Sequence, residues 1–265
     1  MAIDIIVCLK QVVDPEIPMS AFQIDADAKS VVPPATSSPV INGFDEQAVE
    51  VALRIKDTVE TTVTVLSVGN GFNLEAMKRP LAMGADRLIL VDDPLTGDLD
   101  AFSTVTVLVK AIRRIGSYDI VLCGRQASDW DNAHVPLGVA ESLGLPCMTI
   151  AESVETANGS VRVRRFLTDG YQMVEASMPA LVTVSSEVGV ARYPTLRGIM
   201  AATRETPEVW CAADLGLSAA DLASKITLTA LYQPVSETMG EMVSGADEED
   251  AGRKLAHRLR ELNLI

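Results

Sequence analysis

The sequence predicts an α/β protein built on an open, mostly parallel, doubly wound sheet, with a small antiparallel hairpin and a long C-terminal arm. Over residues 4–151, short apolar or β-branched runs alternate with amphipathic stretches. This alternation is typical of parallel strands joined by covering helices. After residue 152 the pattern changes to two short strands around the turn Leu167–Gly170, which is typical of an antiparallel hairpin.

The first strand is expected at Asp4–Lys10, a continuous apolar run suited to burial on both faces. A helix is expected over residues 45–56, where four apolar side chains share one face: Ala48, Val51, Ala52 and Ile55. Asp45 and Glu46 place negative charge at its N-terminus, where the helix dipole favours it. The following strands are expected at residues 61–67, 87–91, 118–123 and 147–151, and the helices at 73–83, 99–115 and 135–143.

The hairpin strands are expected at residues 160–166 and 171–177, and a last sheet strand at 179–185. Beyond Val190 little regular structure is expected before a final helix at 247–262. That helix carries a leucine stripe (Leu255, Leu259, Leu262) opposite a basic face (Arg253, Lys254, Arg258, Arg260). We therefore expect an α/β domain over residues 1–190 and a second region, 191–265, that ends in the arm.

Composition limits the classes of function. The chain has 265 residues, of which 36 are Asp or Glu and 22 are Lys or Arg, so its net charge of -14 argues against a nucleic-acid partner. The apolar runs are too short to span a bilayer, and no targeting segment is recognisable. Four scattered cysteines and two histidines do not form a zinc or iron–sulfur motif. We expect buried free thiols and a cytoplasmic protein.

A ligand site is expected at the carboxyl ends of the parallel strands, near the point where the strand order reverses. Three loops qualify: residues 10–14, 67–71 and 124–134. The third runs into a helix, and the unpaired N–H groups of a helix N-terminus suit a phosphate. The alternative is that Asp129, Asp131 and Asn132 simply cap that helix. The spacing alone leaves both interpretations open.

Several catalytic classes lack their motif. The dinucleotide fingerprint, the P-loop and the nucleophile elbow are all missing. His134 at a helix start is a weak candidate for a general base, and Asp129 and Asp131 have no third ligand at metal spacing. We assign no catalytic residue and no metal ligand.

Seven short segments, taken in order, match one family. They are Val7–Asp14, Ile41–Glu50, Ala82–Arg87, Gly124–Ala127, Asp169–Gly170, Leu181–Thr183 and Ala191–Met200. Through these segments the chain resembles the beta subunit of electron transfer flavoproteins over nearly its whole length.

The resemblance implies an electron-carrying subunit rather than a catalyst by itself. Members are heterodimers with an alpha subunit that holds most of a redox-active FAD, and they accept electrons from acyl-CoA dehydrogenases. The beta subunit binds a second nucleotide. By position, that nucleotide would contact Cys8, Asn42, Gly43, Phe44, Asp45, Val68, Gly124, Arg125, Gln126, Ala127, Ser128, Asp129, Asp131, Asn132, Ala133, His134 and Val135. Phe44 matches the aromatic residue that approaches the alpha-subunit flavin.

The resemblance also implies a docking segment for the dehydrogenase. It comprises Tyr193, Leu196, Arg197, Ile199 and Met200, with Leu196 as the anchor that enters a pocket on the partner. The alternative is an ordinary surface loop with a buried leucine. The lysines that often follow this segment in the family are missing, which leaves the identity of the dehydrogenase open. On the same grounds the helix at 247–262 would pack against the alpha subunit.

The second nucleotide is AMP in ordinary members of the family and a second FAD in electron-bifurcating members that use NADH. In this chain Trp130 and Pro136 replace two glycines of the FAD-type loop, and proline removes an N–H donor. We therefore expect AMP. Gly124–Gln126 and Leu196–Met200 nevertheless resemble the bifurcating branch, so that alternative stays open. A free-standing domain that binds or hydrolyses adenine nucleotides is the third possibility.

Overall fold

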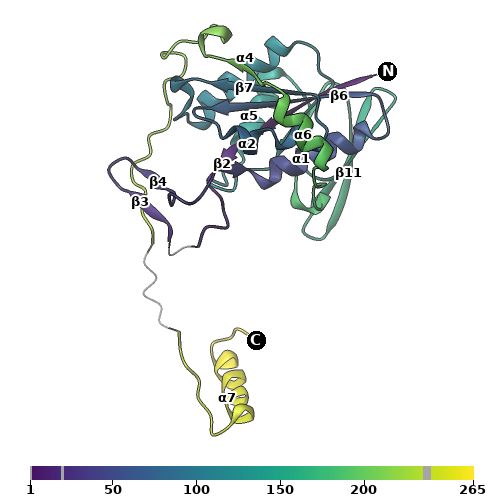
Figure 1. Ribbon diagram of the computed structural model, residues 1–265. Helices are drawn as coiled ribbons and strands as arrows, with labels where there is room; N and C mark the ends of the chain where they lie inside the picture. Colours follow the sequence, from purple (N-terminus) through teal and green to yellow (C-terminus); the bar gives the residue numbers. More distant parts are fainter. Residues whose placement is uncertain (1, 19–20, 235–239) are drawn as a thin grey trace.

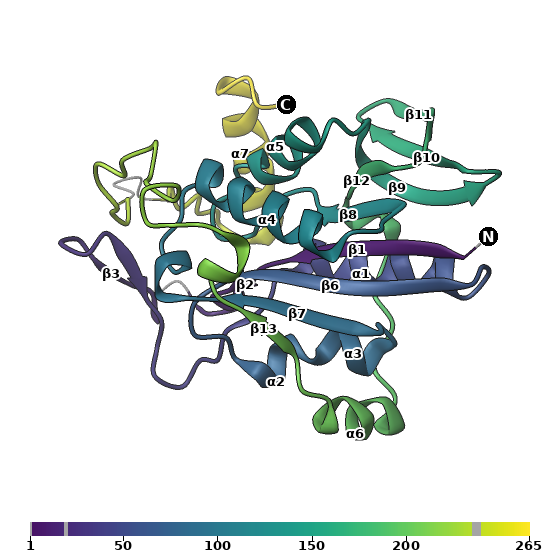
Figure 2. The same cartoon turned by 90° about the horizontal axis from the view of Figure 1, so that it is seen from above.

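The computed structural model describes residues 2–18, 21–234 and 240–265. A nine-stranded sheet forms the centre of the molecule (Figures 1 and 2), in the order β11-β10-β9-β12-β8-β1-β6-β7-β13. The strands are β1 (Ile3–Leu9), β6 (Thr61–Gly69), β7 (Arg87–Asp92), β8 (Ile120–Gly124), β9 (Cys147–Ala157), β10 (Ser160–Leu167), β11 (Gly170–Ser177), β12 (Ala180–Val184) and β13 (Glu208–Trp210). Strands β9, β12, β8, β1, β6, β7 and β13 pair in parallel, and β10 and β11 extend the sheet antiparallel. The predicted fold class is confirmed.

Helices cover both faces of the sheet (Figure 2). One apolar core lies between the sheet and the helices α1 (Gly43–Lys56) and α3 (Arg79–Met83). A second core lies under α4 (Ala101–Ile115) and α5 (His134–Leu143). Alternate residues of β1 enter opposite cores: Ile5 and Val7 the first, Ile6 and Cys8 the second. A strand buried on both faces explains the unbroken apolar run in the sequence.

The chain reverses its direction of travel across the sheet at β1. From β1 it passes through α1 to the neighbouring β6 and then to β7, and it returns through α4 to β8 on the other side of β1. The carboxyl ends of β1 and β8 therefore flank the topological switch point, where open α/β sheets bind their ligands.

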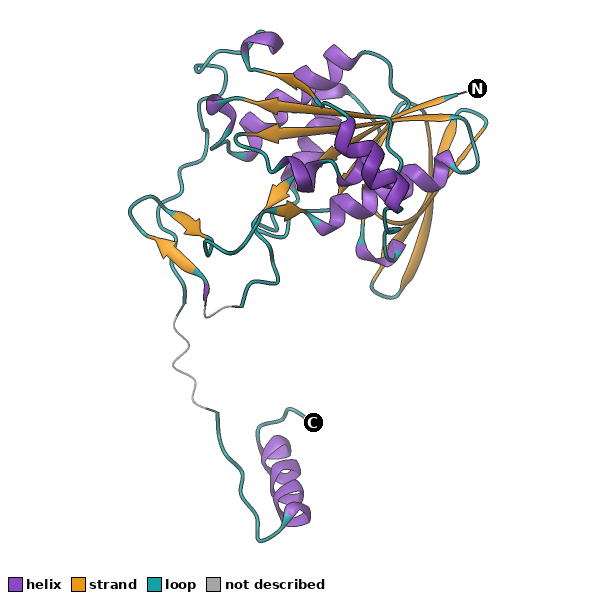
Figure 3. Ribbon diagram, viewed as in Figure 1, coloured by secondary structure: helices purple, strands orange, loops and turns teal. Residues whose placement is uncertain are grey.

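The helix expected at 73–83 is in fact two short ones, α2 (Leu74–Met77) and α3. Pro80 lies in the first turn of α3, where its missing N–H breaks no helical hydrogen bond. The structure also adds two small antiparallel pairs that the sequence did not predict (Figure 3): β2 (Gln11–Val12) with β5 (Val40–Ile41), and β3 (Gln23–Asp25) with β4 (Ser30–Val32).

The expectation of little regular structure after Val190 is wrong. Helix α6 (Leu196–Arg204) lies beside α3, and β13 pairs in parallel with β7 at the edge of the main sheet. The boundary at residue 190 stays a prediction.

The last helix, α7 (Glu248–Glu261), forms where the sequence places it and is set apart from the sheet (Figure 1). Within the described range 240–265, no residue of α7 is buried. Among the described residues, no helix has both the length and the apolar character needed to cross a bilayer.

Candidate functional site

Asp45 joins the two strand ends at the switch point. Its carboxylate accepts a hydrogen bond from the backbone N–H of Lys10 at 2.8 Å, just after β1, and from that of Gly124 at 2.9 Å, at the end of β8. Asp45 lies in the first turn of α1, so one side chain connects a helix to both strands. These bonds fix the relative position of the loops that follow the strands.

Burial dominates the electrostatics of Asp45. It raises the pKa of this carboxyl to about 7, although hydrogen bonds from Asn42, Lys10 and Gly124 act in the opposite direction. Near neutral pH the central carboxyl of the site therefore exists in both protonation states.

Asn42, which is almost fully buried, holds the start of the third loop. Its amide nitrogen donates to the backbone carbonyl of Gln126 at 2.8 Å, and its amide oxygen accepts from the N–H of Ser128 at 3.1 Å. The loop at 125–128 is thus bound to the N-terminus of α1. The structure brings together these residues, which the sequence analysis placed in one nucleotide site.

Phe44 and Arg125 lie beside this junction. The guanidinium carbon of Arg125 is 5.6 Å from the centroid of the Phe44 ring, and its Nε donates to the side chain of Gln126 at 3.2 Å. A cation over the face of an aromatic ring is attracted by the ring quadrupole. The contact gives the half-buried Phe44 a cationic neighbour.

The capping alternative for the third loop is wrong. Residue Ala133 occupies the N-cap of α5 in a left-handed conformation, with φ of 54°, and no side chain of the described loop caps the helix. Asp131 instead accepts from the amide of Gln126 at 2.7 Å. Asp129 binds the ammonium of Lys10 through both carboxylate oxygens, at 2.7 and 2.9 Å.

Lys10 begins the first candidate loop, but it was not among the residues expected to contact the nucleotide, and its pairing with Asp129 was not predicted. Its position directly after a buried strand indicated that it lies near the site. Its partner Asp129 could not be predicted, because it lies 119 residues away in the sequence. The ion pair links the first and third candidate loops across the switch point.

The start of α5 and the loop before it carry hydrogen-bond donors that the described residues leave unpaired. The leading N–H groups of α5 have no partner within the helix, and the buried hydroxyl oxygen of Ser128 has no hydrogen-bond partner among the described residues. Pro136, the third residue of the helix, supplies no N–H. A helix N-terminus of this kind can bind an anion.

Cys8 and Val68 reach the region from the ends of β1 and β6. Cys8 lies opposite Cys123 on the neighbouring strand, and both side chains are buried. A hydrogen bond between the two thiols and burial raise the pKa of Cys123 well above its usual value. Cys123 is therefore a protonated, unreactive thiol at neutral pH. The expectation that all four thiols are buried is wrong, because Cys147 is exposed and Cys211 is half-buried.

The expected docking segment forms the start of α6. The hydroxyl of Thr195 caps the helix by accepting from the N–H of Gly198 at 3.0 Å. Leu196 is 75% exposed, so the alternative of a surface loop with a buried leucine is wrong. Exposed apolar side chains surround it on the same segment: Tyr193, Ile199 and Met200.

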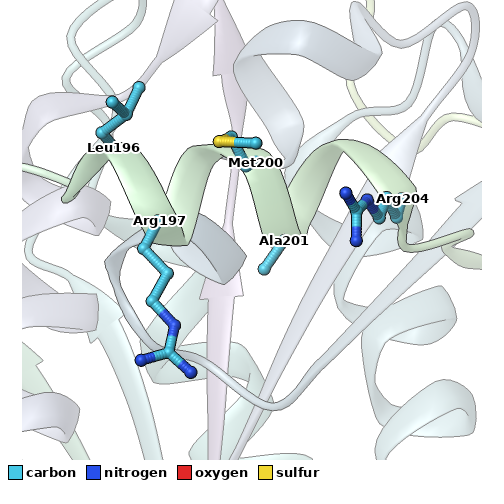
Figure 4. A pocket seen from close by; sticks show the side chains of 5 residues that line it. All are labelled: Leu196, Arg197, Met200, Ala201 and Arg204. Carbon is cyan, nitrogen blue, oxygen red and sulfur yellow. The ribbon is translucent and has the colours of Figure 1, made fainter.

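A shallow hollow runs along the outer side of α6 (Figure 4). It is lined by Leu196, Arg197, Met200, Ala201 and Arg204. The apolar part is therefore bordered by two guanidinium groups, in a chain whose net charge is -14. An exposed apolar side chain with a charged border is typical of a protein-binding surface.

Comparison with known proteins identifies the family. The family model described as "Electron transfer flavoprotein domain" matches residues 35–215. An electron transfer flavoprotein subunit beta of Thermoanaerobacterium thermosaccharolyticum is 36% identical over 266 residues, which cover 99% of this chain and 100% of the relative. The caffeyl-CoA reductase-Etf complex subunit CarD of Acetobacterium woodii is 33% identical, covering 98% and 99%.

A third relative is the acryloyl-CoA reductase electron transfer subunit gamma of Anaerotignum propionicum. It is 35% identical over 199 residues, which cover 74% of this chain and 73% of the relative. The chain belongs to the electron transfer flavoprotein family and is a member of its beta-subunit branch.

Proposed function

We propose that this chain is the beta subunit of a heterodimeric electron transfer flavoprotein that carries electrons from an acyl-CoA dehydrogenase. The redox-active FAD would be held mainly by the alpha subunit, with AMP bound structurally in this one. The observation that carries the proposal is Leu196, a leucine 75% exposed at the start of a capped helix. An exposed apolar side chain of this kind can contribute binding energy by entering a pocket on another protein.

The names of the relatives support a partner of this class. Two of them are named as parts of caffeyl-CoA and acryloyl-CoA reductases, and both substrates are CoA thioesters. A redox enzyme acting on a CoA thioester is therefore the kind of partner that we propose for the surface around Leu196.

The geometry at α5 supports AMP as the nucleotide of this subunit. The hydroxyl of Ser128 is buried without a partner among the described residues, and Pro136, the third residue of α5, supplies no N–H, so few donors are available here. A monophosphate needs fewer donors than a pyrophosphate. Trp130, which is 51% exposed, occupies a position where glycine would let the backbone approach a second phosphate.

Within this proposal the residues bind and orient, and none of them makes or breaks a bond. Asp45 and Asn42 hold the loops that would contact the nucleotide. Phe44, with Arg125 over its ring, would form part of the environment of the alpha-subunit flavin, whose chemistry is to accept and pass on electrons.

The proposed pairing with the alpha subunit uses α7. Leu255 and Leu262 are 46% and 50% exposed, and a helix of this length is only marginally stable by itself. A partner surface over the leucine stripe would supply the burial that α7 lacks among the described residues of this chain.

We place the heterodimer in the cytoplasm because all four cysteines are free, as expected in a reducing compartment.

A second candidate function is an NADH-linked bifurcating subunit, with a second FAD in place of AMP. The residues that favour it are Gly124–Gln126 and Leu196–Met200, which resemble that branch. Gly124 is hydrogen-bonded to Asp45, and Gln126 to Asn42.

The deciding experiment measures nucleotide content. The chain is co-expressed with its alpha subunit and purified as the intact complex, and the nucleotides released on denaturation are quantified by chromatography and mass spectrometry. One FAD and one AMP per heterodimer is the expected result. Two FAD and no AMP would establish the bifurcating alternative. A stable monomer that hydrolyses ATP and binds no flavin would overturn both.

A further inference from the structure

Arg192 ties the segment before α6 to helix α1. Its Nε donates to Glu50 at 2.8 Å and a terminal nitrogen donates to Asp57 at 2.7 Å. The backbone N–H of Arg192 also donates to Glu50, at 3.0 Å. Glu50 and Asp57 belong to the second half and the C-cap of α1. Arg192 is therefore held on α1 both by its backbone and by its side chain.

Glu50 is a buried carboxylate, only 4% exposed, with two arginine partners. Besides Arg192 it binds Arg54 at 2.8 Å, and Arg54 also donates to the backbone carbonyl of Val188 at 2.9 Å. Burial opposes the ionisation of Glu50, but the hydrogen bonds from both arginines outweigh it, so the pKa lies below its usual value. Glu50 is thus ionised at neutral pH and needs its cations, because an uncompensated buried charge is costly.

Only a short stretch separates this ion-pair cluster from the docking helix. Arg192 lies four residues before Leu196; Pro194, between them, has a fixed φ, and Thr195 caps the helix. Because only three residues lie between them, and one of these is a proline, fixing Arg192 also restricts the position of Leu196.

Helix α6 has a second attachment, on the side of α3. A Cβ on Gly198 would lie 2.2 Å from the backbone oxygen of Ala82, so the two helices touch at their backbones there. Ala202 is buried one turn further along. The helix is held at Arg192 through α1 and at Gly198 through α3. Since the first turn of α1 carries Phe44 and Asp45, α1 connects the docking helix to the candidate nucleotide site.

We propose that Arg192 is a positioning residue for docking: through Glu50 and Asp57 it fixes the segment 193–196 on α1 before the dehydrogenase binds. This inference rests on the proposed function. A pre-ordered segment presents Leu196 without the loss of conformational entropy that ordering a loop on binding would require. Arg192 itself is not expected to contact the partner.

The test compares Arg192→Ala, Arg192→Lys and Leu196→Ala in the intact heterodimer. The assay follows electron transfer from a substrate-reduced acyl-CoA dehydrogenase with the heterodimer as the varied acceptor. Arg192→Ala is expected to raise KM for the heterodimer roughly tenfold and to leave kcat within about twofold, because the loss is in pre-ordering. Arg192→Lys should give an intermediate KM, since lysine cannot bind two carboxylates in the same fork geometry.

A second readout measures the ordering directly. In Arg192→Ala, amide hydrogen exchange should become faster over residues 193–200 while residues 43–50 keep their protection. The matched control is Arg162→Ala, which removes an exposed arginine that pairs with Glu175 on β11, the edge strand opposite β13. It should change neither KM nor exchange in α6.

The outcomes separate the inference from the proposed function. If Leu196→Ala raises KM while Arg192→Ala leaves KM and exchange unchanged, the inference is wrong and the docking proposal stands. If Leu196→Ala has no effect, the docking proposal itself fails. A fall in kcat equal to the rise in KM for Arg192→Ala would indicate general damage and overturn the positioning role.

Should Arg192→Ala not fold, Asp57→Asn decides the question. The side chain of Asp57 is 57% exposed and its replacement leaves Glu50 paired. A smaller rise in KM with faster exchange over residues 193–200 is then expected, and no change in either would overturn the inference.

Discussion

Gly124 and Asp45 are in contact in a way that only glycine permits. The N–H of Gly124 donates to a carboxylate oxygen of Asp45 at 2.9 Å, and a Cβ on Gly124 would lie 2.4 Å from that same oxygen. The Cβ of Phe44 would be 2.7 Å away and its backbone carbon 2.8 Å. The end of β8 and the first turn of α1 therefore meet with no space for a side chain.

Gly124→Ala should displace the start of α1 and lower both stability and nucleotide binding. Overpacking of this kind costs about 1–3 kcal/mol in unfolding free energy, and part of the clash is with backbone that cannot rotate away. Thermal melting and nucleotide content of the purified heterodimer measure the two effects. For the melting temperature the matched control is Gly43→Ala, in the first turn of α1, where a Cβ would have no neighbour within 4 Å. Equal melting temperatures for the two variants would contradict this account.

The raised pKa of Asp45 predicts a specific pH dependence of stability. The folded pKa is about 7 against 3.8 for the free side chain, so the folded protein binds the extra proton between these values. The contribution of Asp45 to the unfolding free energy is full below about pH 4 and is lost as the pH rises through 7, by an amount on the order of 4 kcal/mol.

Asp45→Asn removes the titrating group and tests this directly. The unfolding free energy of the wild type minus that of the variant should decrease from pH 4 to pH 8, measured by denaturant titration. Asp27→Asn, at an exposed position, is the control for the loss of one carboxylate. A constant difference for Asp45→Asn would show that Asp45 stays ionised throughout.

The sheet could be predicted because its strands are buried on both faces. Runs such as Ile3–Leu9 are short and rich in β-branched residues, which favours strands over helices, and the helices between them carry regular apolar faces. Helix α6 was not predicted although Leu196, Ile199 and Met200 have helical spacing and Thr195 precedes them as an N-cap; the signal is short, because the helix has only nine residues. Strand β13 has only three residues, of which Trp210 alone is buried.

Within the site, sequence position located the loops but not the ion pairs. The Lys10–Asp129 pair spans 119 residues and the Arg192–Glu50 pair spans 142. The identity of a residue and its local spacing do not predict such a distant partner, because the two side chains are brought together only by the tertiary fold.

The Lys10–Asp129 pair makes a further prediction, which depends on the proposed nucleotide. The side chain of Lys10 is 43% exposed, so the pair adds little to stability. Its effect would be on charge: without Lys10, the carboxylate of Asp129 is uncompensated in the loop that leads into α5. Lys10→Gln should weaken AMP binding to the nucleotide-stripped heterodimer, roughly tenfold, as measured by calorimetry. Asp129→Asn added to Lys10→Gln should restore most of it; no recovery in the double variant would mean that Lys10 acts otherwise.

The choice of AMP over FAD makes a prediction for the α5 loop. Trp130→Gly combined with Pro136→Ala would give the backbone freedom at 130 and restore an N–H at the third residue of α5. The FAD-to-AMP ratio in the purified heterodimer should rise in the double variant. Leu137→Ala, at the next position of the helix, is the control because it changes no backbone donor. If the double variant retains one FAD and one AMP, these two positions do not decide which nucleotide binds.

The leucine stripe of α7 predicts separable effects on assembly and on folding. Leu255→Ala with Leu262→Ala removes apolar surface from a helix in which no described residue is buried, so the melting temperature of the isolated chain should stay the same. Binding to the alpha subunit should weaken by about 2 kcal/mol or more, because such side chains become central contacts once covered. Sedimentation analysis of the mixed subunits measures the association.

The control is Arg253→Ala with Arg260→Ala, on the basic face of the sequence pattern, which should leave association nearly unchanged. Equal weakening by both pairs of substitutions would mean that charge, rather than the leucine stripe, holds the arm on its partner.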